Sequence, residues 1–169
     1  MRNFFVCFHL VCVLPVFADE TEARTPGKAV EVLSFFVGSC WHGTFSDGQS
    51  KDVHCFTPVY NQFVRDTHEV SGELGPYGGE TIYRWNNASR QLEYTYWDTT
   101  GGVSEGVLIP TDDGFVSPEE AYQNAAGETL KMRTRWRLGG PDQWTQLSET
   151  LPDTSRRTLW EITYHRGKE

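Results

Sequence analysis

The sequence predicts an all-β fold, an antiparallel up-and-down barrel of about ten strands with a short N-terminal helix. Short runs rich in aromatic and β-branched residues recur along the chain, and aromatic residues make up 14% of it. Clusters of Gly, Pro, Asn and Asp separate these runs roughly every ten residues, a spacing typical of sandwiches and barrels. The connections are short, so consecutive strands are expected to pair with each other, which favours a barrel over a Greek-key sandwich.

The start of the chain predicts a secretory signal peptide over residues 1–18. A basic residue precedes an almost entirely apolar run, and Val16 and Ala18 match the small-residue pattern before a cleavage site. A membrane anchor is the competing interpretation, but the apolar run is shorter than the roughly 20 residues that a spanning helix needs. A lipoprotein site at Cys12 is a third interpretation, and Val11 is too bulky for the residue that should precede it.

The chain beyond this segment suits one domain. Residues 19–27 are polar and are expected to form a flexible mature N-terminus, and residues 28–169 are expected to form the barrel domain. The net charge of −8 disfavours nucleic acid as a partner, and no stable membrane insertion is expected once the signal peptide is removed. Export implies the periplasm or the extracellular space, where paired cysteines form disulfides.

A helix is expected over 28–37, followed by a hairpin over 38–56. Asp47-Gly48 lies between two strand-like runs and is a strong signal for a two-residue hairpin loop. In that register Cys40 and Cys55 lie opposite each other as a hydrogen-bonded pair, and we predict a disulfide between them. The same register puts His42 and His54 on opposite faces, whereas a bulge at Gly48 would set Cys40 opposite His54.

The later strands are recognised by alternation and by the turns between them. In the clearest one, 129–138, apolar residues such as Met132 and Trp136 share one face and four cations share the other. Pro118 is expected to end or kink a strand, because proline cannot donate to a sheet ladder. The expected strands after the hairpin are 63–70, 80–85, 91–97, 103–109, 115–116 with 119–123, 129–138, 143–150 and 158–166.

The residues around the first strand carry a family resemblance. Phe-Phe-Val-Gly at 35–38 and Trp-His-Gly at 41–43 follow a helical turn, and this pattern resembles the start of calycin-type barrels. It is closer to bacterial lipocalin-like proteins known as a domain of unknown function than to true lipocalins, whose Gly-x-Trp motif is one residue shorter. The resemblance continues more loosely along the mature chain, including residues 77–81. It implies a lipocalin-like barrel and says little about function.

The chain is distantly similar to nitrobindins, which bind haem through a histidine of the last strand. Here His165 lies at the extreme end of that strand and shares a face with Glu161, opposite Trp160 and Tyr164. This departure does not favour haem, and no cofactor is predicted. The histidines of the mature chain lack the i, i+2 or i, i+4 spacing of a metal site, so they are interpreted as isolated and no metal is predicted. They are His42, His54, His68 and His165.

Aromatic residues on the expected inner face favour an exported, non-enzymatic protein that binds a small hydrophobic or aromatic molecule in the barrel mouth. The same residues would also suit a filled core, and hence a structural or interaction module. The expected ligand contacts are Trp41, Tyr83, Tyr94, Tyr96, Trp136 and Trp160.

A catalytic alternative rests on the most polar strand. Asp66 and His68 share one face of it and would suit acid–base work in a small lyase or isomerase. Arg65, Thr67 and Glu69 share the other face, and an ion-pair network fits the strand equally well. The volume and lining of the barrel interior distinguish these alternatives.

Overall fold

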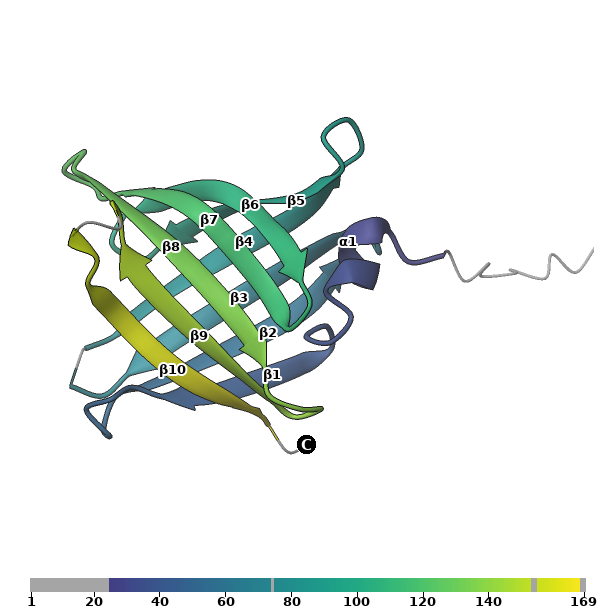
Figure 1. The fold of residues 1–169 in the computed structure, drawn as a ribbon. Helices are drawn as coiled ribbons and strands as arrows, with labels where there is room; N and C mark the ends of the chain where they lie inside the picture. Colours follow the sequence, from purple (N-terminus) through teal and green to yellow (C-terminus); the bar gives the residue numbers. More distant parts are fainter. Residues whose placement is uncertain (1–24, 74, 153–154, 168–169) are drawn as a thin grey trace, which may run out of the picture.

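The computed structural model describes residues 25–73, 75–152 and 155–167, which form a closed antiparallel barrel of ten strands with one short helix, α1 (Lys28–Val32) (Figure 1). Each strand pairs with the next, and the first pairs with the last, so the predicted up-and-down topology is confirmed. The predicted signal peptide, 1–18, lies outside the described residues. The strands are β1 (Ser39–Thr44), β2 (Lys51–Val59), β3 (Phe63–Ser71), β4 (Tyr77–Asn86), β5 (Gln91–Asp98), β6 (Val103–Thr111), β7 (Gly114–Gln123), β8 (Thr129–Leu138), β9 (Gln143–Thr150) and β10 (Thr158–Arg166).

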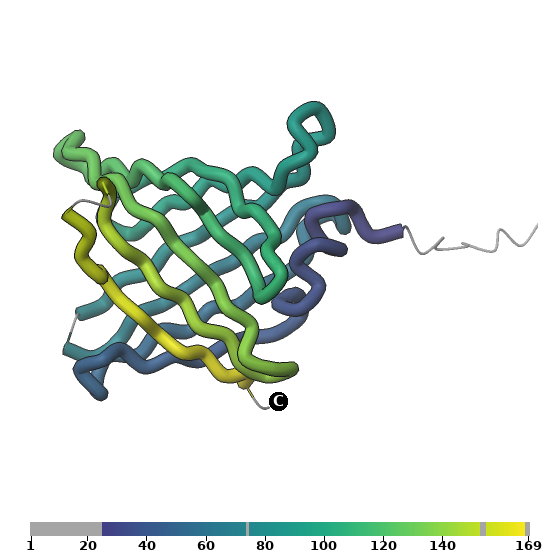
Figure 2. The backbone as a smooth tube through the Cα atoms, in the orientation of Figure 1, coloured from purple at the N-terminus to yellow at the C-terminus, as the bar shows by residue number. Residues whose placement is uncertain are grey.

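One end of the barrel is closed by α1 and the turn that follows it. The backbone tube passes from α1 into β1 and ends in β10, which lies beside β1 (Figure 2). Leu33 and Phe36 are fully buried. The Phe36 ring lies between 4.9 and 5.9 Å from six other aromatic rings, so a plug of aromatic side chains fills this end.

The β1–β2 hairpin has the predicted register but a different loop. Cys40 pairs with Cys55, and their Sγ atoms lie 2.01 Å apart, so the predicted pairing is confirmed. Phe45 N donates to Ser50 O at 2.9 Å, which leaves four residues rather than two in the loop. Alternation from that hydrogen-bonded pair makes Cys40 and Cys55 a non-hydrogen-bonded pair, with Cα atoms 4.1 Å apart. The expected hydrogen-bonded pairing of the cysteines is therefore wrong.

The double substitution Cys40→Ser, Cys55→Ser is expected to lower the free energy of unfolding by about 3 kcal/mol, because the disulfide closes a short loop in the unfolded chain. Urea denaturation of the disulfide-bonded parent protein and of the double variant measures the difference in the free energy of unfolding. A reducing agent should destabilise the parent protein and leave the double variant unchanged. A difference well below about 1 kcal/mol would contradict this expectation.

Strand β7 runs through Pro118, where the sequence predicted that the strand would end or kink, so the strand does not end there. The register of β7 against β8 changes between Ser117 and Glu120, so one extra residue is inserted there as a β-bulge. A bulge accommodates proline because the inserted residue need not donate to the ladder. The inserted residue also exchanges the two faces of the strand beyond it. Glu119 is exposed and Glu120 turns inward as a result.

Candidate functional site

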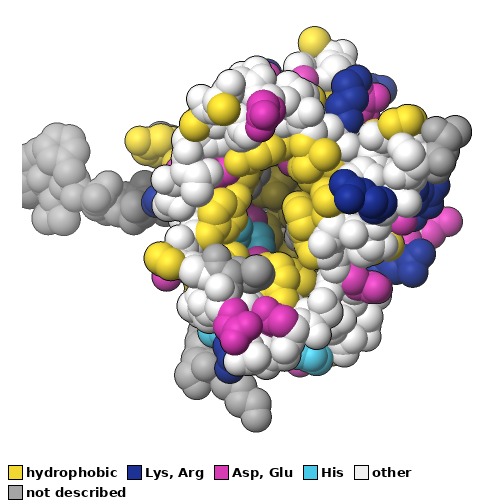
Figure 3. Space-filling view, turned by 90° about the vertical axis from the view of Figure 1, so that its left-hand side faces the viewer, with side chains coloured by type: hydrophobic (Ala, Val, Ile, Leu, Met, Phe, Trp, Pro, Cys, Tyr) yellow, Lys and Arg dark blue, Asp and Glu magenta, His cyan; other side chains and the backbone are white. Residues whose placement is uncertain are grey.

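The barrel encloses a cavity of about 470 Å³ that opens at the end opposite α1. Figure 3 looks into this mouth, where hydrophobic side chains ring a hollow in which acidic and histidine side chains are visible. A volume of this size suits a small organic molecule. The apolar part of the lining comes from Phe45, Val70, Leu108, Leu130, Met132 and Ile162.

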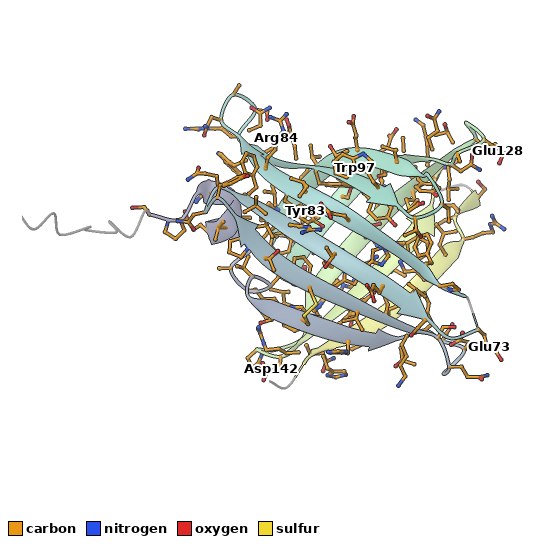
Figure 4. All side chains as sticks on the ribbon, turned by 180° about the vertical axis from the view of Figure 1, so that it is seen from behind. Glu73, Tyr83, Arg84, Trp97, Glu128 and Asp142 are labelled. Atoms are coloured by element: carbon orange, nitrogen blue, oxygen red, sulfur yellow. A yellow bond between two sulfur atoms is a disulfide. The ribbon has the colours of Figure 1, made fainter. Side chains whose placement is uncertain are left out.

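Most of the aromatic residues predicted as ligand contacts line this cavity. They are Tyr83, Tyr94, Tyr96, Trp136 and Trp160. Figure 4 shows how the alternation of β4 places Tyr83 inside the barrel and its neighbour Arg84 on the outside. Two polar walls complete the lining, one on β2 and β3 and the other on β6 to β9.

Trp41 does not belong to the cavity, and its prediction as a ligand contact is wrong for this structure. It faces inward from β1 at the level of the aromatic plug, where it is fully buried. Its ring stacks on Phe35 at 5.0 Å, and the Arg166 guanidinium lies 4.2 Å from its centroid. Its position near the start of β1 fixes it at the closed end of the barrel.

The first polar wall is built around His54. Its Nδ1 atom lies 2.9 Å from Asp66 Oδ2, and its Nε2 atom lies 3.2 Å from Asp52 Oδ2. The Tyr164 hydroxyl donates to the same Asp52 oxygen at 2.9 Å. Because a neutral imidazole has only one N–H, His54 can donate to both carboxylates only as an imidazolium. This wall therefore holds two carboxylates and one cation, all buried.

The pKa values in this wall follow from that arrangement. Burial alone would lower the pKa of His54, but the charges of Asp66 and Asp52 outweigh burial and raise it to about 10. Burial alone would raise the pKa of Asp52, but His54 and His68 outweigh it and hold the pKa well below its ordinary value. His54 is therefore a buried cation at neutral pH.

The stability of the protein is expected to fall at alkaline pH because His54 loses its proton. Its pKa is about 10 in the folded protein and about 6.5 when unperturbed, so its contribution to stability is complete below about pH 6.5. That contribution is lost progressively as the pH rises toward 10. Urea unfolding at about pH 6, 8 and 10 should show a loss of a few kcal/mol that the His54→Gln variant lacks. Equal losses in both proteins would contradict the assignment.

His68 extends this wall toward the open end. Its Nδ1 atom lies 3.2 Å from Asp52 Oδ1, and its Nε2 atom lies 3.1 Å from the Tyr96 hydroxyl. The Tyr96 and Tyr77 hydroxyls are hydrogen-bonded, and Tyr77 donates onward to Asp98. The resulting chain of side chains comprises Asp66, His54, Asp52, His68, Tyr96, Tyr77, Asp98 and Tyr122.

Asp66 and His68, which share a face as predicted, do not pair with each other. Both side chains line the cavity, but Asp66 bonds to His54 and His68 bonds to Asp52. The interpretation of His54 and His68 as isolated histidines is wrong, since their rings stack 4.9 Å apart. His42 and His165 face outward and are exposed, as the alternation predicted.

Asp52, His54 and His68 also present atoms of the types that bind metals, all within 4.8 Å of one another. The two imidazole rings are nearly parallel, with an interplanar angle of 17°. The in-plane lone pairs of two stacked rings do not converge on a single point about 2 Å from both nitrogens. The arrangement therefore suits hydrogen bonding, and a shared ion would require one of the rings to turn.

The second polar wall centres on Glu120, which sequence reasoning missed because the bulge at Pro118 changes its face. Ser104 Oγ donates to Glu120 Oε1 at 2.6 Å, and Thr134 Oγ1 lies 3.5 Å from Oε2. Burial raises the pKa of Glu120, and the hydroxyl donors around it oppose that rise without cancelling it. The wall therefore favours a protonated Glu120 more than an exposed site would.

No protein-family model matches the chain, and no curated protein matches it, so the case for a function rests on the cavity and its lining. The resemblance to lipocalin-like barrels stays a prediction about family. Among the described residues, no helix has the length and apolar character needed to cross a membrane.

Proposed function

We propose that this protein is a lipocalin-like binder that holds a small apolar or aromatic molecule in its barrel cavity. The observation that carries the proposal is the open interior of about 470 Å³ with tyrosine and tryptophan side chains on its walls. Protein cores are packed with few voids larger than a water molecule, so an open space of this size favours a bound molecule over a structural module. Aromatic rings supply apolar contact area, and the two polar walls would orient the molecule.

Export to the periplasm or the extracellular space belongs to the same proposal. The Cys40–Cys55 pair is consistent with an oxidising compartment. Mass spectrometry of protein purified from its own host is expected to find a chain that begins at Asp19. A mature protein that retains residues 1–18 would contradict the proposed signal peptide.

A neutral fluorescent probe tests the binding function. N-phenyl-1-naphthylamine is expected to bind wild-type protein with increased fluorescence. The double substitution Leu108→Trp, Met132→Trp fills part of the cavity and is expected to weaken binding by roughly tenfold or more, because displaced contact area is lost. The double substitution Val103→Trp, Ile109→Trp adds the same bulk at exposed positions and should leave binding unchanged.

Two results of the probe experiment would contradict the proposal. One is that the wild-type protein does not bind the probe. The other is that the inner and the outer pair of tryptophan substitutions weaken binding to the same extent. Circular dichroism of each variant establishes that it is folded. Native mass spectrometry of protein from its own host then shows whether a molecule copurifies with the barrel.

A second candidate function, a small lyase or isomerase, is favoured by one observation: Asp66 and His68 both line the cavity. His68 would exchange the proton, with Asp52 on its Nδ1 atom, while Asp66 would act through His54. Substitution of His68 by Asn would then abolish turnover of a substrate and leave binding of the neutral probe intact.

A further inference from the structure

Glu120 is a carboxyl group on the cavity wall whose described partners are all hydroxyl groups. Ser104 and Thr134 hydrogen-bond to it directly, and the Tyr94 hydroxyl, which is hydrogen-bonded to Ser117 Oγ at 2.9 Å, lies nearby. No Lys, Arg or His among the described residues forms an ion pair with it. The other buried carboxylates differ in this respect, since His54 neutralises Asp66 and Arg135 approaches Glu149. Glu120 therefore lacks a counter-ion on the protein side.

The carboxyl groups of the cavity outnumber its basic groups. Asp52, Asp66 and Glu120 line it, whereas the basic groups of the described lining are two imidazoles, that of His54, which contacts both aspartates, and that of His68, which contacts Asp52. The described lining contains no Lys or Arg. When Glu120 is ionised, this low-dielectric cavity holds an excess of carboxylates, which repels an organic anion and attracts an organic cation. The net charge of −8 on the whole chain attracts cations in the same way.

We infer that the molecule bound in this cavity is an organic ammonium, with its charged nitrogen at Glu120 and its apolar or aromatic body among the tyrosine and tryptophan rings. This inference rests on the proposed binding function and names the class of ligand. The ammonium supplies the counter-ion that Glu120 lacks, and a hydrogen bond between two charged groups is stronger than one between neutral groups. Ring faces add cation–π attraction to the same nitrogen.

The binding of a cation at Glu120 is coupled to the loss of a proton. Burial raises the pKa of Glu120, so the ligand-free protein retains the proton to higher pH than an exposed glutamate would. The groups that face it are Ser104 on β6, Thr134 on β8 and Tyr94 on β5, with Tyr83 and then Asp66 beyond them. When the ammonium binds, the carboxyl proton passes to solvent. Affinity should rise with pH until Glu120 is ionised.

Three indole compounds that differ in charge test the inference. Tryptamine is a cation at neutral pH, tryptophol is neutral and indole-3-acetate is an anion, while the aromatic body is the same. Isothermal titration is expected to show tryptamine binding about tenfold or more tightly than tryptophol, with indole-3-acetate weakest. Glu120→Gln should reduce the affinity for tryptamine to that for tryptophol and leave tryptophol unchanged.

Glu119→Gln provides the matched control. Glu119 is the preceding residue of β7, but it is exposed and pairs with Lys131 at 2.6 Å on the outer face. This variant should retain the full preference for tryptamine. At a pH where ligand-free Glu120 holds its proton, titrations in buffers with different ionisation enthalpies should also show proton release with tryptamine and none with tryptophol.

The outcomes separate this inference from the binding function. If wild-type protein binds N-phenyl-1-naphthylamine but prefers tryptamine no more than tryptophol, or binds neither indole, the cation inference is overturned and the binding function stands. A preference for tryptamine that survives in Glu120→Gln also overturns it. If neither the neutral probe nor any of the indole compounds binds, the binding function itself fails.

Discussion

Replacement of His54 by glutamine is expected to lower the free energy of unfolding by on the order of 3–5 kcal/mol at neutral pH. His54 is 8% exposed and faces a carboxylate with each ring nitrogen. Glutamine retains some hydrogen-bonding capacity but carries no charge. Asp66 would then be left buried without the cation that neutralises it, Asp52 would keep only the contact with His68, and the uncompensated charge accounts for most of the loss.

Urea denaturation of wild-type protein and of His54→Gln measures this effect. His42→Gln is the matched control, because His42 lies on the adjacent strand with its side chain exposed, and it is expected to change stability by less than about 0.5 kcal/mol. Adding Asp66→Asn to His54→Gln should restore part of the loss, since it removes the buried carboxylate that had been paired with His54. A loss of under about 1 kcal/mol in His54→Gln would show that the charge of His54 does not stabilise its group with Asp52 and Asp66.

Replacement of Phe36 by alanine is expected to cost a similar 3–5 kcal/mol, for a different reason. Phe36 is fully buried in the plug, and its ring contacts Phe56, Trp136 and Trp144 among others. Removal of the ring loses its transfer free energy and leaves a void that rigid neighbouring rings cannot fill by small shifts.

Thermal and urea denaturation of Phe36→Ala can be compared with those of Phe63→Ala. Phe63 lies at the start of β3 and is 37% exposed, so its truncation is expected to cost about 1 kcal/mol or less. Equal losses in the two variants would contradict the view that the plug is a main source of stability. The Phe36→Ala protein should also keep the Cys40–Cys55 bond, which lies outside the plug.

Much of the fold was predictable because its local signals are strong and agree with one another. The strands over 129–138, 143–150 and 158–166 were predicted with the bounds that β8, β9 and β10 have. Their alternating patterns run between clear turns, and the two faces differ sharply in polarity. In the first hairpin, Cys40 and Cys55 fixed the register even though the loop is longer than predicted.

The composition of the His54 wall was not predictable, because it depends on one residue of a turn. A two-residue turn at Asn61-Gln62 would have put Glu69 opposite His54 and directed Asp66 and His68 outward. The turn instead contains three residues, with positive φ at Tyr60 and Asn61, and His54 pairs with His68. A shift of one residue exchanges the two faces of a strand, and a tyrosine with positive φ gives no advance signal of it.

Glu120 escaped prediction for the same physical reason. Simple alternation from Ser117 directs Glu119 inward, whereas the inserted residue at Pro118 directs Glu120 inward. Proline in a predicted strand was a signal that the ladder is interrupted, and it was interpreted as an end or a kink of the strand. A bulge satisfies the same constraint without ending the strand, and the sequence alone does not distinguish the two.

The pairing of β1 with β10 determines when during folding the barrel can close. Trp41 lies opposite Arg166, so the closing contact joins the two ends of the domain and is among the most distant along the chain. Until β10 has paired with its neighbours, β1 and β9 each present an unpaired edge to solvent, and such edges can pair with other chains. Contacts of long sequence separation also slow folding. The cavity therefore forms only after the last strand has docked, and a chain that ends before Thr158 would have no enclosed site and two exposed edges.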